Sequence, residues 1–252
     1  MRALKFTLSG RNAFFKKPEV NSYYYFTFGQ IHKVALLGVF GAILGYSGYS
    51  QKEWKSKGKK AAITEEFPEF YEKLKEIKVS VVPKNKKGYI SKKVQYFNNS
   101  VGYASQEQGG NLIVKEQWLE NPKWEIYVLL DCEGAEKLAE FVRNRRCIYI
   151  PYLGKNDHMA DITKAAIVEL KKNEEPEIHL SCLFPKRAAK IVLPDDDEDE
   201  ELDGFKYEET LPAGLDAYTN LYIYETFQFT DFKLHIQDAA VYRTADKTLI
   251  FY

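Results

Sequence analysis

The pattern of apolar and polar positions predicts an alternation of strands and helices over the first 150 residues. Residues 3–8 alternate with the period of two that is typical of a half-buried strand. Helices are indicated where apolar residues recur every three to four positions. The predicted elements are a strand at 3–8, helices at 31–46 and 67–76, strands at 79–82 and 125–130, a helix at 134–145 and a short strand at 147–150. This order favours an α+β fold of the ferredoxin-like βαββαβ type.

Two features extend this basic pattern. The first helix follows an unusually long loop, and long loops in compact domains are usually functional or disordered. Residues 84–124 then lack a helical period, and the turn sequence Gly109-Gly110-Asn111 divides them into two candidate strands. This stretch is therefore predicted to form a long β-hairpin inserted between the second and third strands.

The remainder of the chain is predicted to be β-rich. Weaker strand candidates lie at 162–170 and 178–184, and aromatic residues alternate with polar ones at 221–232 and 241–252. Residues 195–203 hold eight acidic side chains and are expected to form an exposed loop. The chain is thus divided into a ferredoxin-like domain at 1–155, with an insertion at about 84–124, and a smaller C-terminal region at 156–252.

Three glycines occur within the first predicted helix. Gly38, Gly41 and Gly45 share one helix face. Each costs about 1 kcal/mol of helix stability relative to alanine. Their spacing therefore predicts that another backbone packs closely against this face.

Charge is distributed unevenly although the net charge is zero. Residues 1–100 contain 19 Lys or Arg and 7 Asp or Glu, a net of +12, so the remaining residues carry −12. This asymmetry indicates either a polyanionic partner for part of the surface or two ordinary solvated faces.

The three cysteines are scattered and the four histidines form no ligand-spaced pair, so no disulfide framework, metal or cofactor is expected. The scattered cysteines fit a reducing cytoplasm, which is the expected location. The apolar stretch at 34–44 is predicted to be a buried helix, because it is shorter than the roughly 20 residues that span a bilayer.

Basic and aromatic residues are interleaved in three segments, at 11–33, 52–60 and 84–103. Single-stranded RNA is held by cations along its phosphates and by rings stacked on its bases. The candidate RNA-binding residues from this pattern are Arg11, Lys16, Lys17, Tyr25, His32, Lys33, Lys84, Lys86, Lys87, Lys92, Lys93 and Tyr96. His32 and Lys33 begin the first helix, where free N–H groups suit a phosphate. Two alternatives without RNA contact remain open, namely that residues 23–26 form a buried strand and that His32 and Lys33 are ordinary helix-start residues.

Two stretches resemble a known family. The first comprises Phe15-Lys16-Lys17-Pro18, Asn21 and the run from Phe28 to Gly45, in which a loop with a proline and an asparagine leads into a glycine-studded helix. The second is Ile150-Pro151-Tyr152-Leu153-Gly154-Lys155-Asn156-Asp157, similar to a Pro-x-x-Leu-Gly segment. Together they resemble the fifth CRISPR-associated protein family of the repeat-associated mysterious protein superfamily, most closely its type I-B branch. The clear matches cover roughly a quarter of the chain.

The resemblance implies a modified RNA-recognition fold in which residues 84–124 form a thumb-like hairpin, here called the thumb. It implies binding of the repeat-derived 5′ handle of the guide RNA within a Cascade complex for antiviral defence, and it adds Asn21 to the candidate RNA-binding residues. The implied partners are the backbone subunit that coats the spacer and the large subunit that reads target DNA, so contact with target DNA would be indirect. No membrane partner is implied.

Two other functions remain open. Type I-C relatives cut precursor RNA with a tyrosine and an adjacent Lys-His pair. This chain has no Lys-His pair, only the reversed pair His32-Lys33, and Tyr46 as the candidate tyrosine is not sufficient alone. Cleavage needs a base near the 2′-hydroxyl and a stabiliser for the phosphorane. The sequence shows no such set, so a non-catalytic subunit is expected and a repeat-specific endoribonuclease is the alternative. The third hypothesis is a protein-interaction module whose acidic segment 195–203 docks on a basic partner, although a solubilising insertion is the favoured explanation of that segment.

Overall fold

The computed structural model describes residues 1–19, 24–49, 67–103, 106–192 and 204–252. Three sequence predictions lie outside these residues: the role of Asn21, the lysine-rich loop at 52–60 and the acidic loop at 195–203. In the parts of the chain that are described, no helix has the length and hydropathy needed to span a bilayer.

A four-stranded antiparallel sheet organises the chain. Its strands are β1 (Arg2–Ser9), β3 (Val79–Pro83), β6 (Lys123–Leu129) and β7 (Asp161–Glu169), in the order β3-β6-β1-β7. All three pairings are antiparallel. The first and third strands are therefore central and the second and fourth are at the edges, as the ferredoxin-like βαββαβ order requires. The predicted α+β, ferredoxin-like class is confirmed.

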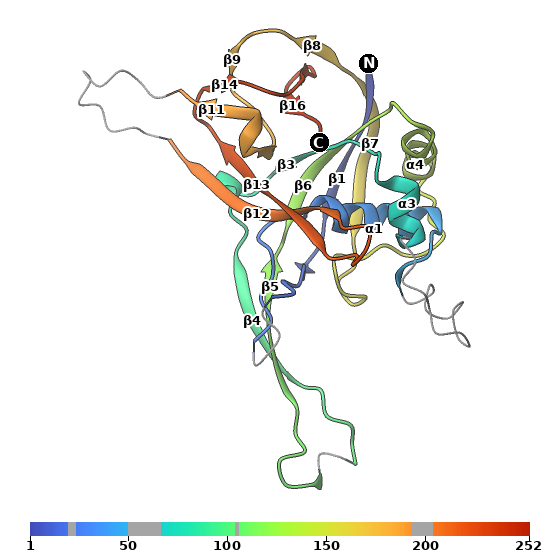
Figure 1. Cartoon of the computed structure of the whole chain (residues 1–252). Helices are drawn as coiled ribbons and strands as arrows, with labels where there is room; N and C mark the ends of the chain where they lie inside the picture. The colour runs from blue at the N-terminus through green and yellow to red at the C-terminus, as the bar shows by residue number, and fades with distance from the viewer. Residues whose placement is uncertain (20–23, 50–66, 104–105, 193–203) are drawn as a thin grey trace, which may run out of the picture.

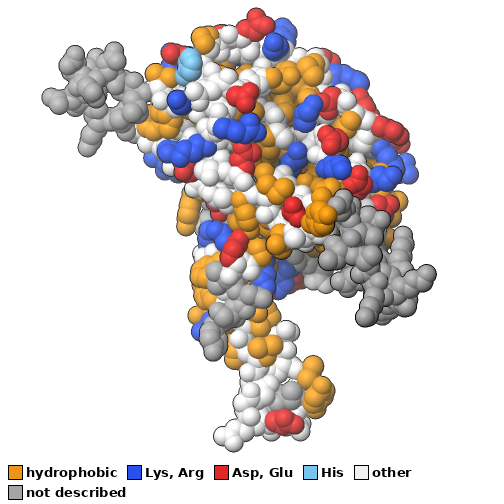
Figure 2. All heavy atoms as spheres, in the orientation of Figure 1, with side chains coloured by type: hydrophobic (Ala, Val, Ile, Leu, Met, Phe, Trp, Pro, Cys, Tyr) orange, Lys and Arg blue, Asp and Glu red, His pale blue; other side chains and the backbone are white. Residues whose placement is uncertain are grey.

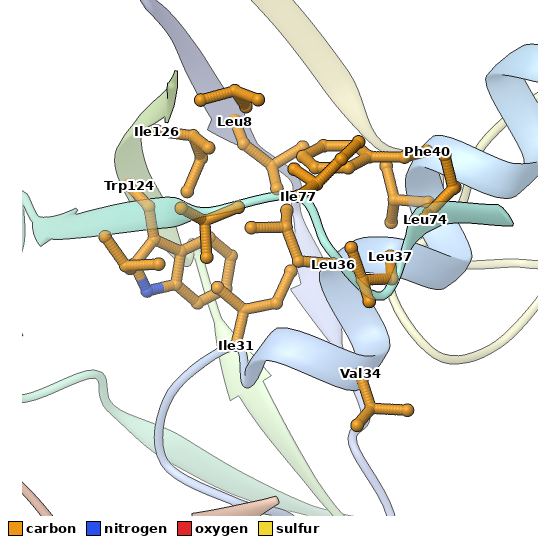
Figure 3. Close-up of a cluster of buried hydrophobic side chains, with 14 of the residues drawn as sticks. Leu8, Ile31, Val34, Leu36, Leu37, Phe40, Leu74, Ile77, Trp124 and Ile126 are labelled. Atoms are coloured by element: carbon orange, nitrogen blue, oxygen red, sulfur yellow. The ribbon is translucent and has the colours of Figure 1, made fainter. Parts of the chain in front are cut away.

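Three helices cover one face of this sheet (Figure 1): α1 (Lys33–Leu44), α3 (Glu69–Leu74) and α4 (Glu133–Arg143). They bury a core in which Leu36, Leu37 and Phe40 of α1 lie with Leu8 and Trp124 of the sheet (Figure 3). A buried amide fixes the entry to α1. Gln30 accepts from Trp124 Nε1 at 2.8 Å and donates to the carbonyl of Gly88.

The predicted strand at 147–150 is wrong. Its residues are exposed, and they bond to the end of α1 instead of to the sheet: Ile148 N–H donates to Ile43 O and Tyr149 N–H to Ala42 O, both at 3.0 Å. The fourth strand is β7, which was predicted only as a weaker candidate. The ferredoxin-like sheet therefore extends beyond residue 155.

The predicted hairpin between the second and third strands is confirmed. It consists of β4 (Lys92–Asn98) and β5 (Ile113–Glu120), paired antiparallel from Lys92 opposite Leu119 to Asn98 opposite Ile113. Strand β2 (Asn12–Ala13) adds to the base of β5. The thumb projects far from the body (Figure 1), and apolar side chains are exposed along it (Figure 2).

The C-terminal region is β-rich, as predicted. Part of it covers the other face of the central sheet, whereas its longest hairpin, at 206–230, packs on the helix side through Leu211, Leu215 and Phe227. A second core joins Ala3 and Tyr127 of that sheet to Phe184, Leu234 and Leu249. The predicted strand at 178–184 forms only at its two ends. The strands and 3-10 turn of this region are β8 (Lys171–Asn173), β9 (Glu177–Ile178), β10 (Phe184–Pro185), η3 (Lys186–Ala188), β11 (Ala189–Ile191), β12 (Lys206–Leu215), β13 (Tyr222–Thr230), β14 (Leu234–Ile236), β15 (Val241–Arg243) and β16 (Thr248–Ile250). A further 3-10 turn, η1 (Lys86–Gly88), lies between β3 and the thumb strands.

The three helix glycines have different surroundings. A Cβ on Gly41 would lie 2.6 Å from Cβ of Phe70 in α3, so this glycine allows the two helices to approach closely. Gly45 ends α1 in the left-handed conformation, with φ of 81°. A Cβ on Gly38 would meet nothing within 4 Å. The prediction of close packing is therefore confirmed at Gly41 but not at Gly38.

This difference provides a matched pair of variants. Gly38→Ala is expected to stabilise the protein by roughly 0.5–1 kcal/mol, because alanine is the better helix former and has room for its methyl group. Gly41→Ala has the same gain in propensity but overpacks against Phe70, which costs about 1–3 kcal/mol. Urea unfolding midpoints should therefore rank Gly38→Ala clearly above Gly41→Ala. Equal midpoints would contradict the packing argument.

Candidate nucleic-acid interface

The two segments that carry the family resemblance meet at the base of the thumb. Phe14 N–H donates to Leu153 O at 3.0 Å, and Leu153 is fully buried. Gly154 has φ of 88°, and a Cβ there would lie 1.9 Å from the carbonyl oxygen of Phe14. Only glycine fits this conformation and this approach. The contact joins residues about 140 positions apart and fixes the loop that precedes α1.

Lys155, the next residue, anchors the thumb. Its Nζ lies 2.8 Å from Glu116 Oε2 on β5, and Trp118 Nε1 donates to the same oxygen at 2.7 Å. Lys155 Nζ also lies 4.9 Å from the ring centroid of Phe97 on β4. One lysine therefore contacts both strands of the hairpin, and the buried carboxylate is paired as burial requires.

Residues 14–19 and 24–28 lie near the same strand. They are joined by Lys17 N–H donating to Phe26 O and Phe28 N–H donating to Phe15 O, both at 2.8 Å. Tyr25 then pairs with β5, since its N–H donates to Lys115 O at 2.8 Å and its carbonyl accepts from Gln117 N–H at 2.9 Å. Tyr25 is half-buried and Phe26 exposed, so the alternative of a buried strand is wrong for these two residues.

Lysines lie over aromatic rings along the thumb. Lys16 Nζ is 4.0 Å from the ring centroid of Tyr25, and Lys115 Nζ is 5.4 Å from that of Tyr96. Lys16 is exposed, and Tyr96 is 58% exposed. Each pair combines a flat ring with a cation, which are the two groups that hold a single-stranded backbone and its bases.

The two strand lysines of the thumb do not act together. Lys92 and Lys93 point to opposite faces because side chains alternate along a strand. Lys93 lies 3.7 Å from Glu120 and over Trp118. Lys92 lies near Lys17 and Glu209, and its partial burial lowers its pKa.

Glu209 on β12 is a carboxylate that the sequence reasoning missed. It accepts from Gly29 N–H at 2.8 and 3.1 Å and from Tyr207 OH at 2.6 Å, and it lies 3.8 Å from Lys17 Nζ. Lys17 is therefore partly neutralised within the chain. A pattern of basic and aromatic residues does not reveal this acidic partner, because Glu209 is distant from Lys17 in the sequence.

The remaining candidates are spread over the surface. Arg11, Lys84, Lys86 and Lys87 are exposed near the base of the thumb, where Lys84 N–H donates to Lys123 O. Lys33 is half-buried in the first turn of α1. Burial lowers its pKa, and its charged neighbours are Glu76 and Lys78. Lys33 therefore lies toward α3 and β3 rather than with the thumb residues.

His32 is a structural residue. It is 4% exposed, it is the N-cap of α1, and its Nδ1 accepts from Ala35 N–H at 3.2 Å. Its ring packs edge-on against Phe15, Phe28 and Tyr222. Burial lowers its pKa to about 3, so His32 is neutral near pH 7 and supplies no positive charge to a phosphate.

The two residues considered for RNA cleavage are far apart. His32 precedes α1 and Tyr46 follows it, which places them about 20 Å apart at 1.5 Å per helical residue. The Tyr46 hydroxyl accepts from Lys137 Nζ at 3.3 Å. Among the described residues, no group of three or more His, Cys, Asp or Glu is placed to hold a metal ion.

Two pockets lie near basic residues. The larger, about 710 Å³, lies in the C-terminal region, where Lys186, Arg187 and Lys206 are already paired with carboxylates. The smaller, about 340 Å³, lies at the base of the thumb and is lined by residues that include Phe15, Lys16, His32, Glu116, Lys155 and Tyr222. The smaller pocket is the one that joins the two motif segments, the start of α1 and the thumb.

Comparisons with known proteins give only distant similarities. No family model matches the chain, and no curated protein matches it. A chain of a CRISPR RNA-guided surveillance complex is similar at 12% identity and a TM-score of 0.49, over 96% of this chain and 91% of that one. A CRISPR protein from Archaeoglobus fulgidus has the same identity and TM-score over 99% and 98% of the two chains. A CRISPR-associated protein is similar at 10% identity and a TM-score of 0.40 over 94% of each chain.

The burial of His32 predicts acid sensitivity. The unfolded chain binds a proton near pH 6.5, whereas native His32 does so only near pH 3. The unfolded state therefore holds more protons between these values, and stability should fall as pH drops below 6.5, by up to about 1.4 kcal/mol per pH unit. His32→Asn keeps a capping side chain and should flatten this dependence between pH 7 and 5 in urea unfolding.

The exposed His235 provides the control, since His235→Asn should leave the dependence unchanged. His158 is also buried with a lowered pKa, so some dependence should remain in His32→Asn. A slope in His32→Asn equal to that of the wild type would show that burial does not lower the pKa of native His32.

Proposed function

We propose that this chain is an RNA-binding subunit of a type I CRISPR Cascade complex, resembling type I-B, that binds the repeat-derived 5′ handle of the guide RNA. One observation carries the proposal: the two segments that resemble the family, at 15–45 and 150–157, meet at the base of a projecting hairpin. Leu153 and Gly154 contact Phe14, which directly precedes the first segment, and residues of both segments line one pocket. A chance resemblance at two distant places in the sequence gives no reason for such a contact. The cations and rings at this place, Lys16 with Tyr25 and Lys115 with Tyr96, suit single-stranded RNA.

The proposed role is structural rather than catalytic. The subunit would hold the handle and dock against the backbone and large subunits, and a separate ribonuclease would process the precursor. Labelled repeat RNA incubated with purified protein and EDTA tests this part. Intact RNA is expected, and clean cutting at a single site would replace the proposal with the endoribonuclease alternative.

The bound RNA tests the proposal as a whole. A tagged chain isolated from its native host should carry RNAs whose 5′ ends share one short repeat-derived tag. Heterogeneous ends, or no RNA, would overturn the proposal and favour the protein-interaction module. Sequencing the 5′ ends distinguishes these outcomes directly.

Salt dependence tests the lysines at the base of the thumb. Each phosphate contact to single-stranded RNA contributes about 0.7 to the slope of log affinity against log salt. The double variant Lys16→Ala, Lys17→Ala should reduce that slope by between about 0.7 and 1.4, because Lys17 is partly neutralised by Glu209. Filter binding of the repeat-derived RNA over a salt series measures it.

The matched control is Lys171→Ala, Lys172→Ala, which removes the same charge from exposed positions of β8, at the end of the molecule away from the thumb (Figure 1). This control should retain the wild-type slope. Equal slopes in both double variants would remove Lys16 and Lys17 from the interface.

A further inference from the structure

The pocket at the base of the thumb is lined in part by Glu116, whose carboxylate is a hydrogen-bond acceptor. Glu116 is 7% exposed, and both of its hydrogen-bonded contacts, from Trp118 Nε1 at 2.7 Å and Lys155 Nζ at 2.8 Å, go to Oε2. An ionised carboxylate has lone pairs on both oxygens and accepts only. In the described part of the chain, no hydrogen bond to Oε1 is found, so this oxygen has capacity to accept from a ligand.

The other walls suit a flat, partly apolar ligand. Phe15 and Tyr222 supply aromatic surface, and His32 supplies a neutral imidazole. Because Nδ1 of His32 accepts from Ala35 N–H, the ring proton lies on Nε2. Lys16 and Lys155 line the same pocket, and Lys155 is paired there with Glu116. A volume of about 340 Å³ is near the lower end of small-ligand sites, which suits one nucleotide and not a folded segment.

We propose that this pocket binds one unstacked nucleobase that has an exocyclic amino group, and that Glu116 accepts a hydrogen bond from that group. The inference rests on the proposed RNA-binding function and adds base selectivity to it. Adenine, cytosine and guanine all have such an amino group, whereas uracil has a carbonyl at the position of the cytosine amino group. A carboxylate facing that carbonyl would leave both acceptors unpaired, and a buried unpaired acceptor is costly. The pocket therefore selects against uracil.

The alternative role for Glu116 is purely architectural, as the anchor for Lys155 and Trp118. The two roles make different predictions. Loss of an anchor weakens the binding of every RNA by a similar factor. Loss of a base contact changes the preference at one nucleotide and leaves the others as they were.

The experiment uses the full chain and the repeat-derived RNA with which it co-purifies. In a series of RNAs, one nucleotide at a time loses its amino group: purine riboside replaces adenosine, inosine replaces guanosine and uridine replaces cytidine. Wild-type protein is expected to lose affinity by about tenfold at one position, the size of a single good base contact. Glu116→Gln should reduce this difference to about threefold or less at the same position, because an amide both donates and accepts.

Glu120→Gln is the matched control, since Glu120 lies on the same strand and pairs with Lys93 at 3.7 Å. It should retain the wild-type preference. The inference fails if wild-type protein binds all members of the series equally. It also fails if Glu116→Gln lowers every affinity by one common factor. Failure of the proposed function is a separate outcome, in which wild-type protein binds the unmodified RNA no better than an unrelated single strand.

Discussion

The close approach of Gly154 to the carbonyl of Phe14 is the contact on which the base of the thumb depends. It requires a residue without a Cβ and a left-handed backbone, and both conditions are met by one glycine. It brings Lys155 within reach of Glu116. The projecting hairpin is therefore attached to the segment between α4 and β7. The contact also fixes Phe14, and the residues around Phe15 and Phe28 lead to Tyr25, which forms hydrogen bonds to β5. A single backbone contact thus positions the cations, the rings and the pocket.

Charge in this protein is less segregated in space than in sequence. The excess of basic residues in the first hundred positions suggested one basic surface, but several of these lysines lie against carboxylates from later in the chain. Lys17 lies beside Glu209, Lys93 beside Glu120 and Lys5 beside Glu125. Folding therefore neutralises part of the asymmetry. The exposed lysines near the base of the thumb are therefore a smaller group than the sequence count implies.

The order of elements and the hairpin were predictable because they depend on local periodicity, which is written directly in the sequence. The fourth strand was assigned wrongly for a physical reason: Cys147 to Ile150 has the composition of a strand, but its N–H groups bond to the carbonyls at the end of α1. His32 was assigned to a phosphate because a helix start favours anions, yet the same position also favours a buried cap. The roles of Glu116 and Glu209 depend on contacts between distant segments, which no local pattern contains.

The stability of the thumb changes along its length, and this bears on what its surface does. At its base, β5 has neighbours on both edges, β4 on one and Tyr25 with β2 on the other. Beyond Tyr25 the described strands form a two-stranded ribbon, and such ribbons are marginally stable in water. Tyr103, Leu112 and Ile113 are 54–79% exposed there, although burying them would help to hold the strands together. Under the proposed function, unstacked bases would cover these rings and methyl groups while their phosphates reach Lys115.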